Sequence, residues 1–403
     1  MGHARERHKR FPETWWVQFN IESKPSMAEP AYPAARVVAP TMASYFHRHL
    51  AVEDESHGKM ALLPDAGSIE RMIDAAFWAS LRREEGYIPK ISLAFLRPEQ
   101  TVSPLLFERP LPLGPAALAR LAPAVERPGI HLGVWREREE LRVWGTTRAI
   151  PTFCFVVEVI DPGLLVVKHR RSESGKFVNV LVLEGDQIKV VDERASSLPD
   201  CPPLLTSLLG FESPSSWLEG VHVLVELAAS MRAHRRGGSL LVVPAGTEPW
   251  RESILQPVGY AVAPPFTELA DVMRADAGER QQRRWQDAMY RSVEAIAGLT
   301  AVDGATVITD QYELLCFGAK IGRRRESTRV QEVVVTEPIE GSAAVTVHPA
   351  ELGGTRHLSA AQFVQDQRDA VSLVASQDGR FTIFAWSPCE TMVHAHRVES
   401  LLL

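Results

Sequence analysis

Three short clusters in the last third of the chain combine residue types that can bind a phosphorylated ligand or a cation. The first, Asp303-Gly304-Ala305, places a carboxylate before two small residues. Small residues let the backbone approach a ligand closely, and a carboxylate is a ligand that divalent cations prefer. Asp303 is therefore a candidate metal ligand, although a simple turn into the next strand would have the same sequence.

The second cluster is Gly353-Gly354-Thr355-Arg356-His357, and it opens a predicted helix. Free backbone N–H groups, the positive end of the helix dipole, a guanidinium and an imidazole would meet at this N-terminus. Such a combination predicts an anion site suited to phosphate. A capped helix whose arginine and histidine are only solvated remains the alternative.

The third cluster runs from Ser376 to Gly379 and separates strands that we expect at Ala370–Ala375 and Phe381–Trp386. A hairpin turn between the strands explains its composition. Its place after the other two clusters makes the hydroxyl of Ser376 a candidate phosphate contact.

In their order and strand settings, the three clusters resemble the diadenylate cyclase (DAC) family. The resemblance covers roughly Ser213–Trp386, because a helix expected at Ser216–Arg235 and a strand expected at Ser239–Val243 look like the opening of that domain. Proteins of this family fold as a mixed sheet flanked by helices. They condense two ATP molecules into cyclic di-AMP with a divalent cation, across a face-to-face dimer.

The resemblance implies a role for each cluster. Asp303 would bind Mg²⁺ or Mn²⁺ and orient the attacking 3′-hydroxyl, and Arg356 and His357 would join it in catalysis. The residues expected to bind the nucleotide and its phosphates are Gly304, Ala305, Gly354, Thr355 and Ser376. ATP would be the substrate of an enzyme that works as a homodimer or a higher homo-oligomer.

Two positions differ from the family pattern. Leu358 stands where the family usually has an arginine, and Gln377 stands where an acidic residue commonly follows the serine, with Asp378 as a possible substitute. These differences keep a second function open, in which a degenerate DAC-like domain acts as a nucleotide-binding sensor or scaffold. A third interpretation is an α/β protein with three chance motifs, and a structure with Asp303 far from Arg356 and His357 would support it.

A segment between the first two clusters either supplies the missing phosphate contacts or forms a solvated loop. Its arginines are Arg323, Arg324, Arg325 and Arg329.

The elements around the clusters predict an α/β (α+β) fold class. We expect a helix over 278–298 and a hairpin of Thr306–Ile308 with Leu314–Phe317, followed by strands at Val333–Val335 and Ala343–Val347. The proline-rich stretch Ser196–Ser216 predicts a domain boundary. The domains would be a disordered extension (1–40), a regulatory domain (41–210) and a nucleotide domain (213–403).

The regulatory domain should be a smaller α+β unit with an antiparallel sheet. A helix is expected to begin at the N-cap Ser68, with Leu81 on its buried face, and a second helix at Pro115–Leu121. The strands are expected at Leu132–Trp135, Leu141–Trp144, Phe153–Ile160, Leu164–His169, Phe177–Leu183 and Ile188–Val191. The segment Gly175–Val180 resembles the sensor-like (DACNV-like) regions that precede some DAC domains.

Two sets of residues have both a structural and a ligand-binding interpretation. His394 and His396 either bind a metal or lie on the surface. Aromatic side chains on the N-terminal strands either pack the sheet or form a ligand cage. They are Trp135, Trp144, Phe153 and Phe155.

Bulk properties narrow the class of protein. The 403 residues include 45% hydrophobic and 23% charged residues, which is typical of globular proteins with more than one core. The net charge of −6 argues against sequence-independent binding of nucleic acid, and no apolar run reaches the length of a membrane span. Four widely spaced cysteines fit reduced thiols in the cytoplasm.

Overall fold

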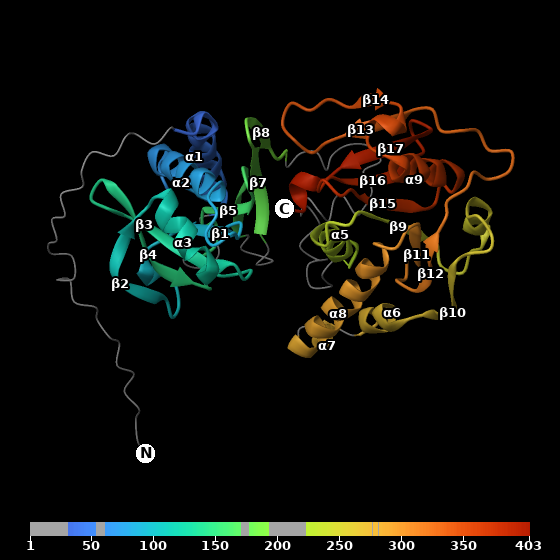
Figure 1. The fold of residues 1–403 in the computed structure, drawn as a ribbon, viewed down its shortest axis with the longest axis horizontal. Helices are drawn as coiled ribbons and strands as arrows, with labels where there is room; N and C mark the ends of the chain where they lie inside the picture. Colours follow the sequence, from blue (N-terminus) through green and yellow to red (C-terminus); the bar gives the residue numbers. More distant parts are fainter. Residues whose placement is uncertain (1–30, 54–60, 171–176, 193–222, 276, 281) are drawn as a thin grey trace, which may run out of the picture.

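The computed structural model describes residues 31–53, 61–170, 177–192, 223–275, 277–280 and 282–403. They form two lobes side by side, each built on one mixed β-sheet with helices (Figure 1). The predicted α/β fold class is confirmed. The expected boundary at Ser196–Ser216 lies outside the described residues.

The N-terminal lobe contains an eight-stranded sheet of order β2-β4-β3-β1-β5-β6-β7-β8. Its strands are β1 (Ile91–Phe95), β2 (Leu105–Pro112), β3 (His131–Glu137), β4 (Glu140–Thr147), β5 (Val156–Asp161), β6 (Leu164–Arg170), β7 (Phe177–Glu184) and β8 (Gln187–Val190). Its helices are α1 (Pro33–Glu53), α2 (Ala66–Ser80) and α3 (Pro115–Val125), with the 3-10 turn η1 at Pro98–Gln100. These helices share one core with the sheet.

The prediction of a purely antiparallel sheet is wrong at one place. Strand β1 pairs in parallel with β3, where Leu93 lies opposite Leu132, while its other neighbour β5 is antiparallel. Neither β1 nor β2 was expected from the sequence. Strand β2 is an edge strand with mostly exposed side chains and contains Pro110 and Pro112, a composition that is typical of a connection.

Helix α2 begins earlier than its sequence indicates. The N-cap is Asp65, whose Oδ1 accepts a hydrogen bond from the backbone N–H of Ser68 at 2.8 Å. Ser68 therefore lies inside the first turn, and the expected N-cap at this residue is wrong because an aspartate three residues upstream caps the helix instead. The helix ends at Ser80, and Leu81, expected on the buried face, is 48% exposed. Helix α1 begins at Pro33, within the range 1–40 in which no fold was expected.

The C-terminal lobe contains a nine-stranded sheet of order β10-β12-β11-β9-β15-β16-β17-β13-β14. Its strands are β9 (Gly238–Val243), β10 (Tyr260–Phe266), β11 (Ala305–Thr309), β12 (Leu314–Ala319), β13 (Val333–Thr336), β14 (Val345–Val347), β15 (Val371–Ala375), β16 (Phe381–Ser387) and β17 (Met392–Arg397). Its helices are α5 (Val223–Ala233), α6 (Glu268–Met273), α7 (Ala277–Arg280), α8 (Arg283–Leu299) and α9 (Thr355–Asp366). Short 3-10 turns lie at η3 (Pro249–Ser253), η4 (Pro349–Glu351) and η5 (Glu399–Leu401).

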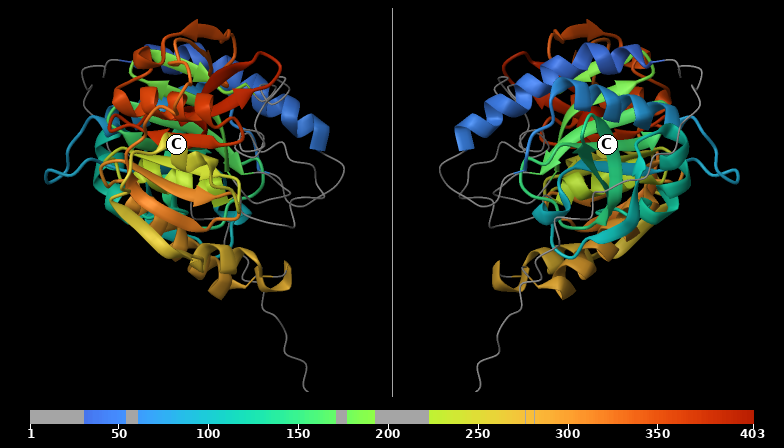
Figure 2. Two further views of the ribbon diagram at one scale, coloured as in Figure 1. Left: turned by 90° about the vertical axis from the view of Figure 1, so that its right-hand side faces the viewer. Right: turned by 90° about the vertical axis from the view of Figure 1, so that its left-hand side faces the viewer.

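Helices cover both faces of this sheet. Leu240 and Val242 of β9 pack in the cluster that includes α5 and α8, whereas Leu241 and Val243 pack with Phe363 of α9. This burial on both faces explains the continuous apolar run of β9. Figure 2 shows α6, α7 and α8 at the end of the lobe away from β13 and β14. The predicted hairpin of β11 and β12 is confirmed as an antiparallel pair.

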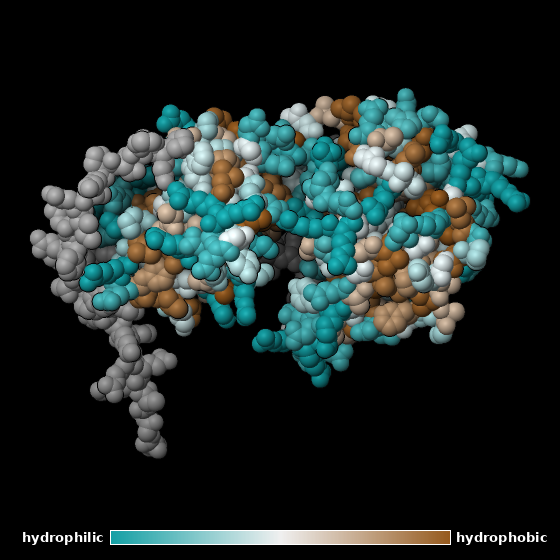
Figure 3. Space-filling view, in the orientation of Figure 1, coloured by the Kyte–Doolittle hydropathy of each residue, from teal (hydrophilic) through white to brown (hydrophobic). Residues whose placement is uncertain are grey.

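The two lobes meet through polar contacts. The side chain of Asn179 in β7 donates hydrogen bonds to the backbone oxygens of Ser400 at 3.0 Å and Leu403 at 3.1 Å. Lys189 of β8 lies 2.9 Å from Glu337, and hydrophilic side chains dominate the visible surface at the junction (Figure 3). In the part of the chain that the structure describes, no helix combines the length and the apolar character needed to cross a membrane.

Candidate functional site

The sheet register brings the first and third clusters to the same edge of the C-terminal sheet. Strand β9 is central, and its Ser239 lies opposite Ala305 of the parallel strand β11. On the other side, Gly238 lies opposite Ala375 of the antiparallel strand β15. The loop before β11 and the turn that begins at Ser376 therefore flank the start of β9.

The second cluster reaches this edge through Arg356 in the first turn of α9. A Cβ atom built on Gly237 would lie 3.0 Å from Nη1 of Arg356 and 3.3 Å from the carbonyl oxygen of Ala375. The charge of Arg356 also helps to lower the pKa of Asp303. Arg356 thus approaches the end of the sheet at which Asp303 lies, and the structure does not show the wide separation that would have supported the interpretation of three chance motifs.

Asp303 is an exposed carboxylate held by a lysine that the sequence did not single out. Nζ of Lys320, just after β12, lies 2.6 Å from Oδ2 of Asp303, and the aspartate side chain is 91% exposed. The hydrogen bond from Lys320 and its charge hold the pKa of Asp303 below its ordinary value, and Arg356 adds to this effect. The carboxylate is therefore ionised at neutral pH and accessible to a ligand.

Gly304 must be glycine for the loop to form as it does. Its φ is +121°, and a Cβ atom would lie 2.4 Å from the carbonyl carbon of Gly318. Gly318 in turn has φ +63°, and its own Cβ atom would lie 2.7 Å from the ring of Tyr260. The backbone of Gly318 thus packs against the Asp303 loop, and the ring of Tyr260 packs against Gly318.

The ring of Tyr260 stacks on Phe317, with ring centroids 4.7 Å apart and an interplanar angle of 6°. Tyr260 is 53% exposed, so this aromatic pair presents a flat apolar surface next to the Asp303 loop. Nucleobases stack on surfaces of this kind.

His357 is buried rather than displayed at the edge. It is 3% exposed, and its ring meets Phe384 edge-on at 6.1 Å. A Cβ atom on Gly353 would lie 2.5 Å from Nδ1 of His357, so the glycine makes room for the imidazole. Burial lowers the pKa of His357, which Asp378 partly offsets, and its buried Nε2 has no hydrogen-bond partner among the described residues.

The side chain of Ser376 forms its hydrogen bonds within its own turn. Its hydroxyl donates to the carboxylate of Asp378, and the backbone N–H of Arg380 donates to the same Oγ at 3.1 Å. Asp378 also lies 3.4 Å from the guanidinium of Arg380, and the bond from Ser376 lowers the pKa of Asp378. Thr355 is exposed at the start of α9, and Ala305 is buried at the start of β11.

Leu358 lies in a cavity of about 430 Å³ that two arginines line. Its side chain packs partly against the hydrophobic core beneath α9. Because leucine is apolar, it cannot supply the positive charge of the arginine that the family usually has at this position. Arg323 and Arg329 reach the same cavity, together with the hydroxyl of Ser359. Neither arginine has an ion-pair partner within the described ranges, whereas Arg324 is paired with Glu252 at 2.7 Å.

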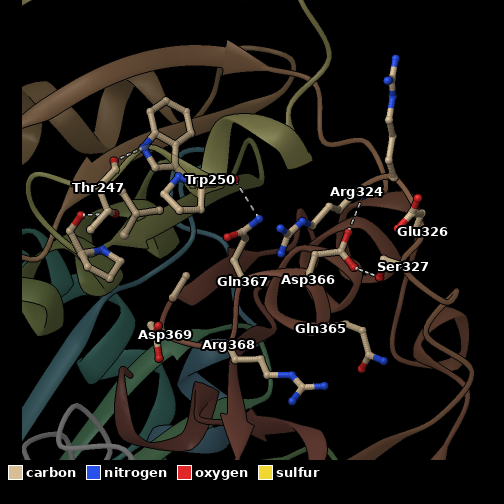
Figure 4. A pocket seen from close by; sticks show the side chains of 15 residues that line it. Thr247, Trp250, Arg324, Glu326, Ser327, Gln365, Asp366, Gln367, Arg368 and Asp369 are labelled. Carbon is tan, nitrogen blue, oxygen red and sulfur yellow. Dashed lines mark hydrogen bonds between the residues drawn. The ribbon is translucent and has the colours of Figure 1, made fainter.

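A larger cavity of about 600 Å³ lies at the opposite end of the same strands, lined by Val243 and Ala370 (Figure 4). Two of its polar side chains bind backbone groups of other lining residues: Gln367 donates to the backbone oxygen of Pro249 at 3.1 Å, and Asp366 accepts from the backbone N–H of Arg324 at 2.8 Å. None of the three clusters lines it.

His394 and His396 of β17 are buried rather than on the surface, and within the described residues they have no third metal ligand. His394 lies 2.9 Å from Glu390, and Nδ1 of His396 lies 2.7 Å from the hydroxyl of Thr336. Burial lowers the pKa of His396 to about 3. Within the described residues, no group of three or more His, Cys, Asp or Glu side chains could hold a metal ion.

Comparison with known families connects the N-terminal lobe with sensing. Residues 58–148 match the family model described as "Probable sensor domain DACNV". The match covers less than a quarter of the chain, spans α2 to β4 and ends before the three clusters. It does not include Gly175–Val180, where the sequence alone placed this likeness, and Gly175 lies outside the described residues. No curated protein matches the chain.

Proposed function

We propose that the C-terminal lobe is a diadenylate cyclase-type nucleotide domain and that the N-terminal lobe regulates it. The observation that supports this most is the register of β9 with β11 and β15, which places Asp303 and the turn at Ser376 around one strand end. Arg356 reaches the same place from α9. Three short motifs far apart in the sequence thus contribute to one edge.

The chemistry of this edge suits nucleotidyl transfer. Phosphoryl-type transfer depends mainly on positioning and on neutralising negative charge. Arg356 and Lys320 supply fixed positive charge, and the N-terminus of α9 supplies backbone N–H groups beside Thr355. The buried Nε2 of His357 has no hydrogen-bond partner among the described residues and would be available to a phosphate oxygen that reached it.

In the proposed reaction, the 3′-hydroxyl oxygen of each ATP forms a bond to the α-phosphorus of the other. Each transfer breaks the bond between the α-phosphorus and the bridging oxygen to the β-phosphate, so two pyrophosphates leave and two hydroxyl protons are released. Asp303 is placed to accept a hydrogen bond from the attacking hydroxyl, because it is ionised and exposed. The Tyr260–Phe317 pair would stack the adenine.

The accessible carboxylate of Asp303 is the feature of this edge that suits a divalent cation. Mg²⁺ is commonly held by one or two carboxylates together with substrate phosphates, and Asp303 is the accessible carboxylate of the first cluster. When bound, the cation would neutralise phosphate charge. Lys320 would have to release Asp303, because its ammonium occupies one carboxylate oxygen.

The proposal requires two copies of the chain. Each copy presents one such edge, and the two ATP molecules must react with each other, so the edges of two copies have to face one another. The exposure of Asp303 and Tyr260 fits an edge that is completed by a second copy. Because ATP is found mainly inside cells, we propose that the activity is cytoplasmic.

A second function, nucleotide binding without turnover, is favoured by the Lys320–Asp303 ion pair and by Leu358. Parallel measurement of binding and turnover separates the two. We would measure the affinity of the full chain for ATP by calorimetry in EDTA and assay cyclic di-AMP with Mn²⁺ by mass spectrometry. Binding with product supports the cyclase, binding without product supports the sensor, and failure to bind ATP overturns both.

A further inference from the structure

A cavity of about 380 Å³ lies in the N-terminal lobe, among residues of β2, β3 and β4 and the segment after β1. All of its lining residues fall within the range 58–148 that matches the sensor-domain model. Its charged and aromatic lining includes Arg97, Arg136, Arg138, Arg142, Trp135 and Trp144. In Figure 1, β2, β3 and β4 lie on the side of this lobe away from the C-terminal lobe. The cavity is therefore separate from the proposed nucleotide site.

One wall of the cavity is a fixed indole ring. Trp144 is buried, and its Nε1 donates a hydrogen bond to the backbone oxygen of Leu96 at 2.8 Å. The ring lies directly on Gly133, since a Cβ atom there would come within 1.9 Å of Cζ2. The glycine and the hydrogen bond hold the ring in place before any ligand binds. Such preorganisation lowers the entropic penalty of binding.

A second aromatic wall comes from Trp135, which is partly exposed. Its ring centroid lies 4.7 Å from that of Phe95, and the guanidinium of Arg97 lies 4.8 Å from the ring. An aromatic surface beside a guanidinium favours a planar ligand that carries negative charge.

The charges of the lining give the cavity a positive excess, since four arginines accompany two glutamates. Arg136 is paired with Asp65, and Arg142 is paired with Glu137 at 3.4 Å and with Glu140 at 2.9 Å. Arg97 and Arg138, by contrast, have no carboxylate partner in the described part of the chain.

We propose that this cavity binds a small aromatic anion, with its planar ring against Trp135 and its carboxylate or phosphate held by Arg138 and Arg97. The volume lies at the lower end of the range of small-molecule sites, about 300–1,000 Å³, and admits a ligand of about two fused rings. The ligand would be the signal that the sensor lobe detects. This binding does not depend on the proposed cyclase activity.

The test uses the full chain and four probes in calorimetry: 2-naphthoate, 2-naphthyl phosphate, neutral 2-naphthol and inorganic phosphate. Either anionic ring compound should bind at least tenfold more tightly than 2-naphthol and inorganic phosphate, and the stronger of the two identifies the preferred anion. The affinity for it should fall at least tenfold in Arg138→Gln and in Arg97→Gln. Arg127→Gln, which changes an exposed arginine of the same lobe outside the cavity, should bind as the wild type does.

Two results would overturn the proposal. One is that neither anionic ring compound binds more tightly than 2-naphthol. The other is that they bind but Arg138→Gln and Arg97→Gln retain full affinity, which would place the binding elsewhere. Both substitutions change exposed side chains, so thermal unfolding curves should match the wild type and exclude misfolding as the cause of lost binding.

Discussion

Nζ of Lys320 lies 2.6 Å from Oδ2 of Asp303, and this ion pair sets the charge of the candidate metal ligand. Because Lys320 and Arg356 lower the pKa of Asp303, the carboxylate stays ionised throughout about pH 5 to 8. Protonation of Asp303 should thus limit turnover only in more acidic solution. The pairing also predicts a competition between the lysine and a cation for the same oxygen.

Replacing Lys320 tests this relationship. In Lys320→Ala the pKa of Asp303 should rise toward its ordinary value, because its hydrogen-bond donor and nearest positive charge are removed. The acidic limb of kcat/KM against pH should therefore move to higher pH. Arg127→Ala, which removes an exposed positive charge of the other lobe, is the control. An unchanged acidic limb in Lys320→Ala would mean that Asp303 does not govern it.

The cavity beside Leu358 predicts which arginines contact phosphate. Each charge-assisted hydrogen bond is worth about 1.5–3 kcal/mol, so Arg323→Gln and Arg329→Gln should each weaken ATP binding about tenfold or more. Arg291→Gln, on the exposed side of α8, should bind ATP normally. Calorimetry with ATP in EDTA measures this without turnover. If both cavity variants retain wild-type affinity, the two arginines belong to a solvated loop.

The contact between lobes predicts a route for regulation. Asn179 binds the backbone of Ser400 and Leu403, while Arg232 donates to the backbone oxygen of Leu402 and, at 3.2 Å, to that of Gly379 in the turn of the third cluster. Asn179→Ala should therefore change the KM for ATP at least twofold. The effect would reach the proposed ATP site from the other lobe, since Asn179 belongs to none of the three clusters. Asn179→Asp retains the shape but loses the amide donor, and it should behave like the alanine variant. Normal kinetics in both would show that this contact only joins the lobes.

His131 predicts a loss of stability in acid. Its ring is buried, Nδ1 lies 2.7 Å from the hydroxyl of Ser92, and burial followed by the charge of Lys168 lowers its pKa to about 4. The unfolded chain binds a proton near pH 6.5, while the folded chain does so only near pH 4, so stability falls as the pH drops through this window. The fall should approach about 3 kcal/mol for this group.

Urea unfolding at about pH 7 and pH 4.5 measures the fall. His131→Asn, which retains a hydrogen-bonding side chain but cannot titrate, should lose most of this pH dependence. An equal fall in the variant would assign the acid sensitivity to other groups.

The sequence predicted much of the C-terminal lobe because its strands are continuous apolar runs bounded by turn residues. Strand β9 and the β11–β12 hairpin are examples. Strand β10 was missed, because it is an exposed edge strand that contains Pro264 and Pro265. Strand β17 was missed because His394 and His396 interrupt its apolar pattern.

The candidate site was predicted in part. Local motifs identified Asp303, Arg356 and Ser376, but bringing them together depends on the pairing of strands that are not consecutive in the sequence, β9 with β11 and β15, which the sequence does not specify. Lys320 and Tyr260 had no local signal, because a single lysine or tyrosine at a strand end is common. The burial of His357 depends on Gly353 and on packing against Phe384.

Product analysis with ATP tests the central claim most directly. Purified full chain would be incubated with ATP and Mn²⁺ or Mg²⁺, beside Asp303→Asn and the matched control Asp369→Asn, which changes an exposed aspartate at the opposite end of the sheet. We predict cyclic di-AMP, identified by mass, from the wild type and Asp369→Asn but not from Asp303→Asn. Equal product from Asp303→Asn, or no product from the wild type despite bound ATP, would contradict the cyclase.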